Sequence, residues 1–189
     1  ATSTSGIITV MAGDIVLNDT VSSSGNLTLI PATANSTIGI GGGNGNFNLD
    51  DTDLGRLSDG FGSITIGNTS AGTGVIDIDS STFADPLIIV GGSIVVTELN
   101  AGSNAVTLMT RNGAITDGGD GGTDVTASSL FATATTGIGN AGNAIETAVS
   151  NLEAVGGTGV VNVSNMGDLV IGGIGAATGV STTDADISI

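Results

Sequence analysis

The sequence predicts an all-β protein folded as a parallel β-helix, and three observations point to this fold. The 189 residues include 33 glycines and 39% hydrophobic residues, but only 2% aromatic residues. Glycine is repeatedly followed by apolar residues two and four positions later, as in "GVVNV" from Gly159 and "GDLVI" from Gly167. These phrases recur with a summed period of about 20 residues, which suits the coils of a solenoid.

The glycine-led phrase occurs along most of the chain. Alternation of apolar and polar residues over four or five positions is typical of a strand with one buried face. We expect the glycine to supply a positive φ at each bend between strands. The phrase begins at Gly6, Gly13, Gly25, Gly62, Gly74, Gly92, Gly159 and Gly167, with Asn104 in the place of glycine and a shortened version at Gly113.

The spacing of these phrases separates the β-helix from its main alternative, a β-sandwich. A long and a short step together lead from Gly6 to Gly25, and again from Gly92 to Gly113. A sandwich usually has longer strands and a buried Trp or Tyr, and both residue types are absent here. At about 20 residues per coil, we expect roughly nine coils whose interior holds stacks of Ile, Val and Leu.

Residues 1–189 are predicted to form one β-helix segment. A stretch rich in Gly, Asn and Asp interrupts the repeat at residues 38–61, where we expect a loop or an elaborated coil. Neither end looks capped, since the repeats start by Gly6 and the last residues, "DADISI", still alternate. We therefore expect part of a longer protein or a subunit that stacks into a filament.

Residues 143–155 carry two conflicting patterns. Ile145, Val149 and Leu152 form a helical stripe behind a possible capping box. As a strand, the same segment alternates Ile145, Thr147 and Val149 and restarts after a bend. Local signals alone slightly favour the helix.

One long run resembles a known family. "GIGNAGNAIETAVSNLEAVGGTGVVNVSNMGDLVIGG" is similar to the repeats of filamentous-haemagglutinin-like proteins and related large secreted bacterial adhesins. "NAVTLMTRNGAITDG" resembles the phrase that often precedes it, so the resemblance covers about residues 104–173. It implies a right-handed parallel β-helix, strands within 145–154, and a long non-enzymatic stalk that is extracellular, at the cell surface.

Charge and composition exclude several classes of partner. The chain has eighteen acidic residues and only two basic ones, Arg56 and Arg111, which gives a net charge of −16. This charge repels phosphate groups, so nucleic acid and anionic membrane surfaces are excluded as partners. The longest strongly apolar run, "PLIIV", is far shorter than a membrane span, so we expect no membrane insertion. The chain has no Cys and therefore no disulfides.

The same composition argues against an enzyme. His, Cys, Lys and Tyr are all absent, which leaves few nucleophiles or bases. Asp77 and Asp79 could project together from one strand, but nothing comparable recurs one coil away. We expect no catalytic residues and no organic cofactor.

Two acidic stretches are candidates for Ca²⁺ binding, with a solvated acidic turn as the favoured alternative. "DGGDGGTD" places three carboxylates in a flexible loop, where glycine lets backbone carbonyls join as ligands. "GGNGNFNL" at 42–49 resembles one copy of a calcium-binding nonapeptide repeat, except that Phe47 replaces its Asp. The candidate ligands are Asp117, Asp120 and Asp124 in the first stretch, and Asp50, Asp51 and Asp53 beside the second.

Five N-x-[ST] sequons are candidates for glycosylation, although several arise by chance in a chain so rich in Thr, Ser and Asn. They lie at Asn18, Asn26, Asn35, Asn68 and Asn162.

The function expected from these observations is a structural or adhesive component of the cell exterior, such as a stalk, fibre or sheath element. Its expected partners are further copies of itself, end to end or laterally, or flanking repeats of the same chain, with host or matrix surface molecules as possible targets. The alternative is a Ca²⁺-dependent surface module that bridges neighbouring chains or glycans.

Overall fold

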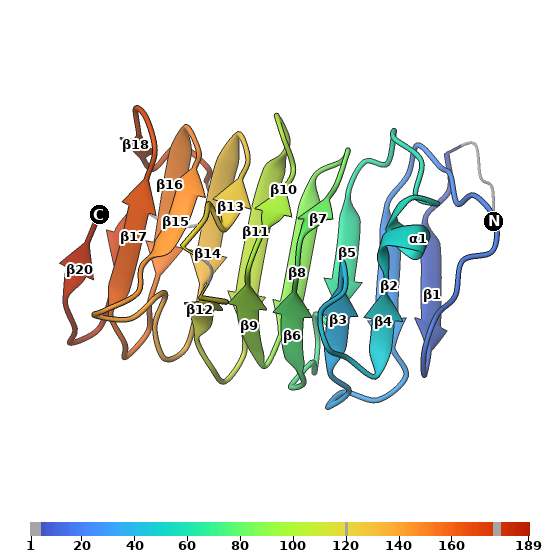
Figure 1. Ribbon diagram of the computed structural model, residues 1–189, viewed down its shortest axis with the longest axis horizontal. Helices are drawn as coiled ribbons and strands as arrows, with labels where there is room; N and C mark the ends of the chain where they lie inside the picture. The colour runs from blue at the N-terminus through green and yellow to red at the C-terminus, as the bar shows by residue number, and fades with distance from the viewer. Residues whose placement is uncertain (1–4, 120, 176–178) are drawn as a thin grey trace.

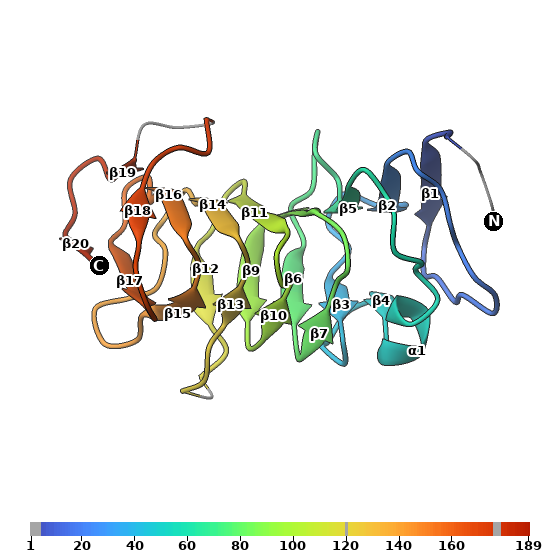
Figure 2. The same ribbon diagram turned by 90° about the horizontal axis from the view of Figure 1, so that it is seen from above.

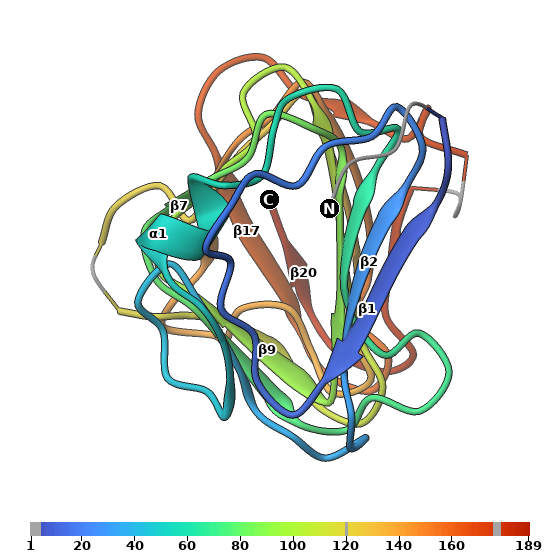
Figure 3. The same cartoon turned by 90° about the vertical axis from the view of Figure 1, so that its right-hand side faces the viewer.

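The chain winds into a parallel β-helix whose coils stack along one axis. The computed structural model describes residues 5–119, 121–175 and 179–189. Figure 1 shows the coils from the side, with β1 and β20 at opposite ends of the rod, and Figure 3 looks along the axis. All pairs of named strands are parallel, so the predicted fold class is confirmed and the β-sandwich is wrong.

Three sheets form the sides of the rod, and each coil contributes strands to them in turn. The nine-stranded sheet contains β1 (Ile8–Ala12), β2 (Leu27–Pro31), β5 (Ile64–Gly67), β8 (Leu87–Gly91), β11 (Ala105–Thr110), β14 (Ser129–Thr133), β16 (Asn151–Val155), β18 (Val170–Ile171) and β19 (Val180–Ser181). The six-stranded sheet contains β7 (Ser81–Thr82), β10 (Leu99–Asn100), β13 (Val125–Thr126), β15 (Ile145–Ala148), β17 (Val161–Asn165) and β20 (Ile187–Ser188). The five-stranded sheet contains β3 (Ile38–Ile40), β4 (Phe47–Leu49), β6 (Val75–Ile78), β9 (Ser93–Val96) and β12 (Ile115–Asp117).

The nine-stranded sheet sets the number and length of the coils. Its main path passes through eight strands, so the rod has eight coils where roughly nine were expected. Successive coils place Ile64, Leu87, Val106, Leu130 and Leu152 at equivalent positions as register partners. Most steps along this series are longer than the predicted period, and they are unequal, because the corners between sheets differ in length.

The core consists of the stacks of apolar side chains that the alternation predicts. One stack runs along the nine-stranded sheet through six residues that are each at most 1% exposed: Leu29, Ile66, Ile89, Leu108, Ala132 and Ala154. A second stack runs along the five-stranded sheet through Ile38, Ile76, Ile94 and Ile115. Each inward side chain thus packs against its equivalents in the coils above and below.

The repeat glycines serve a different purpose from the one predicted. Of the glycines that open the predicted phrases, Gly167 has a positive φ, 95°, and the others that the structure describes do not. At Gly159, Gly74 and Gly92 an added Cβ would instead overlap a backbone carbonyl oxygen of the neighbouring coil, that of Thr136, Ser36 and Thr73 respectively. Glycine is required there because two coils approach backbone to backbone.

Residues 143–155 are extended, so the local helical signal is wrong and the strands implied by the resemblance are present. The segment forms β15 and β16 with a bend at Ser150. Leu152 lies between Leu130 and Ile171 in the ladder of the nine-stranded sheet. Pairing with coils on both sides outweighs a weak helix propensity, since the strand gains inter-coil hydrogen bonds and buries its apolar face.

The stretch at 38–61 forms β3, β4 and α1 (Asp51–Leu54). β3 pairs with β6 on one side and with β4 on the other, so the chain doubles back toward the N-terminal end before it reaches β5. Figure 2 shows α1 near that end of the rod, on the side opposite the nine-stranded sheet. Within the described residues, no helix is both long and apolar enough to cross a membrane.

Candidate metal centre

Three acidic side chains meet at the corner between the five-stranded and six-stranded sheets. Asp117 is the last residue of β12, Asp124 immediately precedes β13, and Glu146 lies in β15 of the next coil. These positions place the carboxylates of Asp117 and Asp124 at the two ends of the connection between β12 and β13. One carboxylate oxygen of each residue lies within 4.8 Å of those of the other two.

Asp124 is held rigidly by the coils on both sides. Its backbone N–H donates to the Glu146 carbonyl (2.9 Å), and its carbonyl accepts from the Leu99 N–H (2.7 Å). Its Oδ2 accepts the Glu146 N–H at 2.8 Å. The residue is 0% exposed, and its Oδ1 is buried without a hydrogen-bond partner.

The other two carboxylates are also incompletely satisfied. Asp117 Oδ1 accepts the N–H of Gly119 at 2.6 Å, but its Oδ2 is buried without a partner. Glu146 Oε2 is likewise buried and without a partner. The cluster therefore contains three buried carboxylate oxygens, one from each side chain, that accept no N–H or hydroxyl group among the described residues.

The pKa of Asp124 is strongly perturbed. Its pKa is raised from 3.8 to about 8, mainly because burial disfavours the charged form. The Glu146 N–H donated to the carboxylate lowers this pKa, whereas the charges of Asp117 and Glu146, and a hydrogen bond between the protonated carboxyl and Asp117, contribute to the rise. The surroundings of Asp124 therefore favour its protonated form, and the three carboxylates are candidate ligands for a cation.

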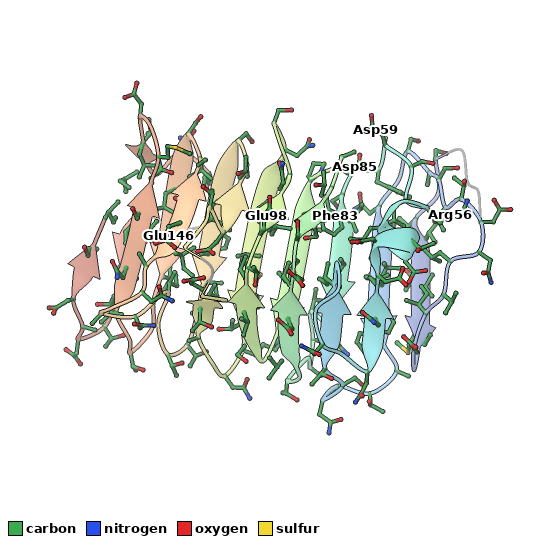
Figure 4. All side chains as sticks on the ribbon, in the orientation of Figure 1. Arg56, Asp59, Phe83, Asp85, Glu98 and Glu146 are labelled. Atoms are coloured by element: carbon green, nitrogen blue, oxygen red, sulfur yellow. The ribbon has the colours of Figure 1, made fainter. Side chains whose placement is uncertain are left out.

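Asp124 and Glu146 belong to a column of acids that runs across the coils. Leu99, Val125 and Thr147 are register partners, so the residues that precede them, Glu98, Asp124 and Glu146, occupy equivalent positions. Glu98 and Glu146 lie at a similar height on the rod in Figure 4. Unlike Asp124, Glu98 is exposed, and its Oε2 accepts the Ser80 hydroxyl at 2.7 Å.

Two of the predicted ligands in "DGGDGGTD" thus come together, Asp117 and Asp124, and Asp120 lies outside the described residues. Glu146 was not among the predicted ligands. A signal existed, because the step from Asp124 to Glu146 equals the step between the stacked residues Leu130 and Leu152. Aligning the chain at that local period would have placed the two acids side by side.

The second predicted group, Asp50, Asp51 and Asp53, is engaged in local structure. Asp50 Oδ1 accepts the N–H groups of Thr52 (2.8 Å) and Asp53 (2.9 Å) and so caps α1. The buried Asp53 accepts the Leu17 N–H at 2.6 Å through Oδ1 and the Asp50 N–H at 3.4 Å through Oδ2. Asp51 is exposed. The oxygens that bind these donors hold α1 against the N-terminal coil.

The Asn side chains of the five sequons differ in their exposure and in their hydrogen bonds. Asn18, Asn26 and Asn35 are exposed. Asn68 is half-buried, and its Oδ1 accepts the N–H groups two and three residues later. The Nδ2 of Asn162, the atom that a glycan would modify, donates to the Asn140 carbonyl at 2.6 Å.

Asp77 and Asp79, the pair considered for catalysis, make separate local contacts. Asp77 Oδ2 accepts from both the backbone N–H (2.8 Å) and the side-chain Nδ2 (2.9 Å) of Asn44. Asp79 Oδ1 accepts the Ser80 N–H at 2.8 Å. Asp77 thus binds the connection between β3 and β4, whereas Asp79 binds within its own turn.

Comparison of the chain with models of protein families, with curated proteins and with solved structures finds no match. The resemblance of residues 104–173 to large secreted adhesins therefore stays a prediction.

Proposed function

We propose that this chain is a non-enzymatic structural element of the cell exterior, part of an adhesin-like stalk, fibre or sheath. The observation that carries the proposal is the open sheet edge at each end of the rod. Among the described strands, β1 pairs with β2 alone, and β18 and β20 are the last strands of their sheets. Unpaired edges of this kind are templates for further strands.

Exposed apolar side chains concentrate at the same two ends. Of the nine large hydrophobic residues that are exposed in the described part of the chain, eight lie near an end of the rod. The N-terminal group is Ile7, Met11 and Val16, and the C-terminal group is Met166, Val170, Ile171, Ile187 and Ile189, while Val75 lies midway. Exposed apolar side chains next to an open sheet edge favour association through the ends.

The polarity of the rod makes such association directional. Because the strands are parallel, the C-terminal edge of one rod matches the N-terminal edge of the next, and the contact repeats without closing. Flanking coils of the same polypeptide would continue the ladder in the same way as a second copy. The net charge of −16 opposes contact between the sides of rods and so favours end-to-end growth.

The test is light scattering after size-exclusion chromatography, with negative-stain electron microscopy of the same fractions. The isolated chain should form end-to-end chains of rods, each about 40 Å long. Val170→Lys combined with Ile187→Lys, at the C-terminal end, should leave single rods. The matched control is Val75→Lys, which places the same charge on an exposed apolar residue midway along the rod and should assemble like the wild type.

Single wild-type rods at high protein concentration would contradict assembly by this chain alone. Equal loss of assembly in the Val75 variant would show that the contacts are lateral. The alternative function, a Ca²⁺-dependent module that bridges chains or glycans, is favoured by the acidic cluster of Asp117, Asp124 and Glu146. If it is correct, EDTA will dissolve the assemblies, whereas end-to-end pairing of sheets survives EDTA.

A further inference from the structure

We infer that Asp117, Asp124 and Glu146 form a Ca²⁺ site that ties two neighbouring coils together within one chain. This inference is independent of the proposed end-to-end assembly. A site that binds Ca²⁺ could belong to a monomer or a filament, and the filament could form without the ion.

The argument starts from the unsatisfied oxygens rather than from the clustering of acids. Asp124 is completely buried, and its Oδ1 has no hydrogen-bond partner. A buried polar atom without a partner destabilises a folded protein, so each such atom points to a missing partner. Asp117 Oδ2 and Glu146 Oε2 add two more such atoms to the same cluster.

A cation satisfies this group of oxygens better than the chain's own donors do. A single shared proton can link two carboxylates but leaves the third without a partner. The only cationic side chains in the sequence are Arg56 and Arg111, and neither is hydrogen-bonded to these three oxygens. One positive ion placed among the carboxylates would contact all three and offset their mutual repulsion.

The donor set favours Ca²⁺. All ligands are carboxylate oxygens, and the chain has no His or Cys to attract a softer metal. Ca²⁺ takes six to eight oxygen ligands in flexible geometry, whereas Mg²⁺ needs a near-ideal octahedron and is usually bound by one or two carboxylates. Three carboxylates from separate strands and loops therefore suit Ca²⁺ better. Carbonyl groups of the glycine-rich loop and water would complete the coordination shell.

The ion would join residues from two coils. Asp117 and Asp124 flank the loop between β12 and β13, whereas Glu146 comes from β15, which pairs with β13 in the next coil. Without the ion, like-charged side chains from adjacent coils repel each other across this corner. Bound Ca²⁺ would replace that repulsion with a direct link and hold both ends of the loop on the rod.

The first experiment uses the wild-type chain, stripped with EDTA, dialysed and titrated with CaCl₂ in buffered NaCl. Calorimetry should give one saturable site per chain, with a dissociation constant on the order of 10⁻⁴–10⁻³ M, as in extracellular calcium modules. In ¹⁵N NMR spectra the largest shifts should belong to the amides of Gly119 and Glu146, which donate to the carboxylates of Asp117 and Asp124.

The second experiment compares matched variants in the same titration. Asp124→Asn and Glu146→Gln should each weaken Ca²⁺ binding at least tenfold. Glu98→Gln is the control, because it removes one charge from the equivalent position of the preceding coil, where the carboxylate is exposed and bonded to Ser80. It should bind Ca²⁺ like the wild type.

Three results would overturn the inference. The first is the absence of saturable heat and of amide shifts in the wild type up to about 10 mM Ca²⁺, well above the expected dissociation constant. The second is an equal loss of affinity in Glu98→Gln, which would indicate general charge screening. The third is tighter binding of Mg²⁺ than of Ca²⁺ at the same amides. The wild-type spectra decide the question even if Asp124→Asn fails to fold.

Discussion

Replacing Gly159 with Ala should be severely destabilising, although it adds only one methyl group. The added Cβ would overlap the carbonyl oxygen of Thr136 in the neighbouring coil, far inside the 3.0 Å limit that real Cβ atoms respect. The obstacle is backbone, so no side-chain rotation relieves it and the coils must separate. Overpacking of this kind costs about 1–3 kcal/mol where side chains can adjust, and we expect about 3 kcal/mol or more here.

The matched control is Gly13→Ala. Gly13 opens an equivalent phrase and lacks a positive φ, but an added Cβ there meets nothing within 4 Å. Alanine at a compatible site stabilises by about 0.4–1 kcal/mol, because it restricts the unfolded chain. The two variants should therefore differ by about 3–4 kcal/mol in the free energy of unfolding.

Urea unfolding followed by far-ultraviolet circular dichroism measures this difference, and it suits a chain without Trp or Tyr. The midpoint should fall for Gly159→Ala and rise slightly for Gly13→Ala, with unchanged slopes. If both variants shift the midpoint in the same direction and by similar amounts, close approach of coils does not explain the repeat glycines.

Three further predictions concern stability, each measured by urea unfolding. In EDTA, the free energy of unfolding should fall by up to about 1.4 kcal/mol per pH unit as the pH rises from about 4 to about 8. The reason is that folded Asp124, with a pKa of about 8, keeps a proton that the unfolded chain has released. Asp124→Asn should flatten this slope, and an unchanged slope would refute the assignment. Leu108→Ala should lower the free energy of unfolding by about 2–5 kcal/mol, because it opens a cavity in a core stack. Met11→Ala is the control, and since that side chain is 64% exposed, its effect should stay within about 0.5 kcal/mol. Similar losses of stability in the two variants would contradict the assigned core. Asp53→Ala should lower the free energy of unfolding by about 1–3 kcal/mol, because it leaves two backbone N–H groups without their acceptor. Asp51→Ala, at an exposed side chain, should be close to neutral. Equal effects of the two substitutions would show that capping of α1 is not the reason.

The fold was predictable because its main signal is local and repeated. Alternation places Ile89 and Leu108 inward in neighbouring strands, and the stacking of such residues follows once strands pair with their equivalents one coil away. The coil count was less predictable, since the corners vary in length and hold no apolar pattern that fixes where a coil ends. The segment containing Leu152 was ambiguous because its helical stripe is local, while the pairing that decides its conformation comes from two other coils.

The candidate site was predictable in part for the same reason. Asp117 and Asp124 share a short loop, so proximity in sequence brought them together. Glu146 joins them through the stacking of coils, at a spacing longer than the predicted period of about 20 residues. The role of the repeat glycines was also hidden, since a sequence shows that a side chain is missing but not which neighbouring backbone takes its place.

One departure from the coil length bears on how such a rod tolerates added sequence. Leu27 and Ile64 are direct ladder partners although the chain between them is much longer than an ordinary coil. The extra chain, which includes α1, leaves the register of the nine-stranded sheet intact. Peptides inserted at a corner between two sheets should likewise be displayed on the side of the rod without changing the strand register of the nine-stranded sheet. The scaffold can therefore diversify its surface by insertion at corners while its interior stays the same.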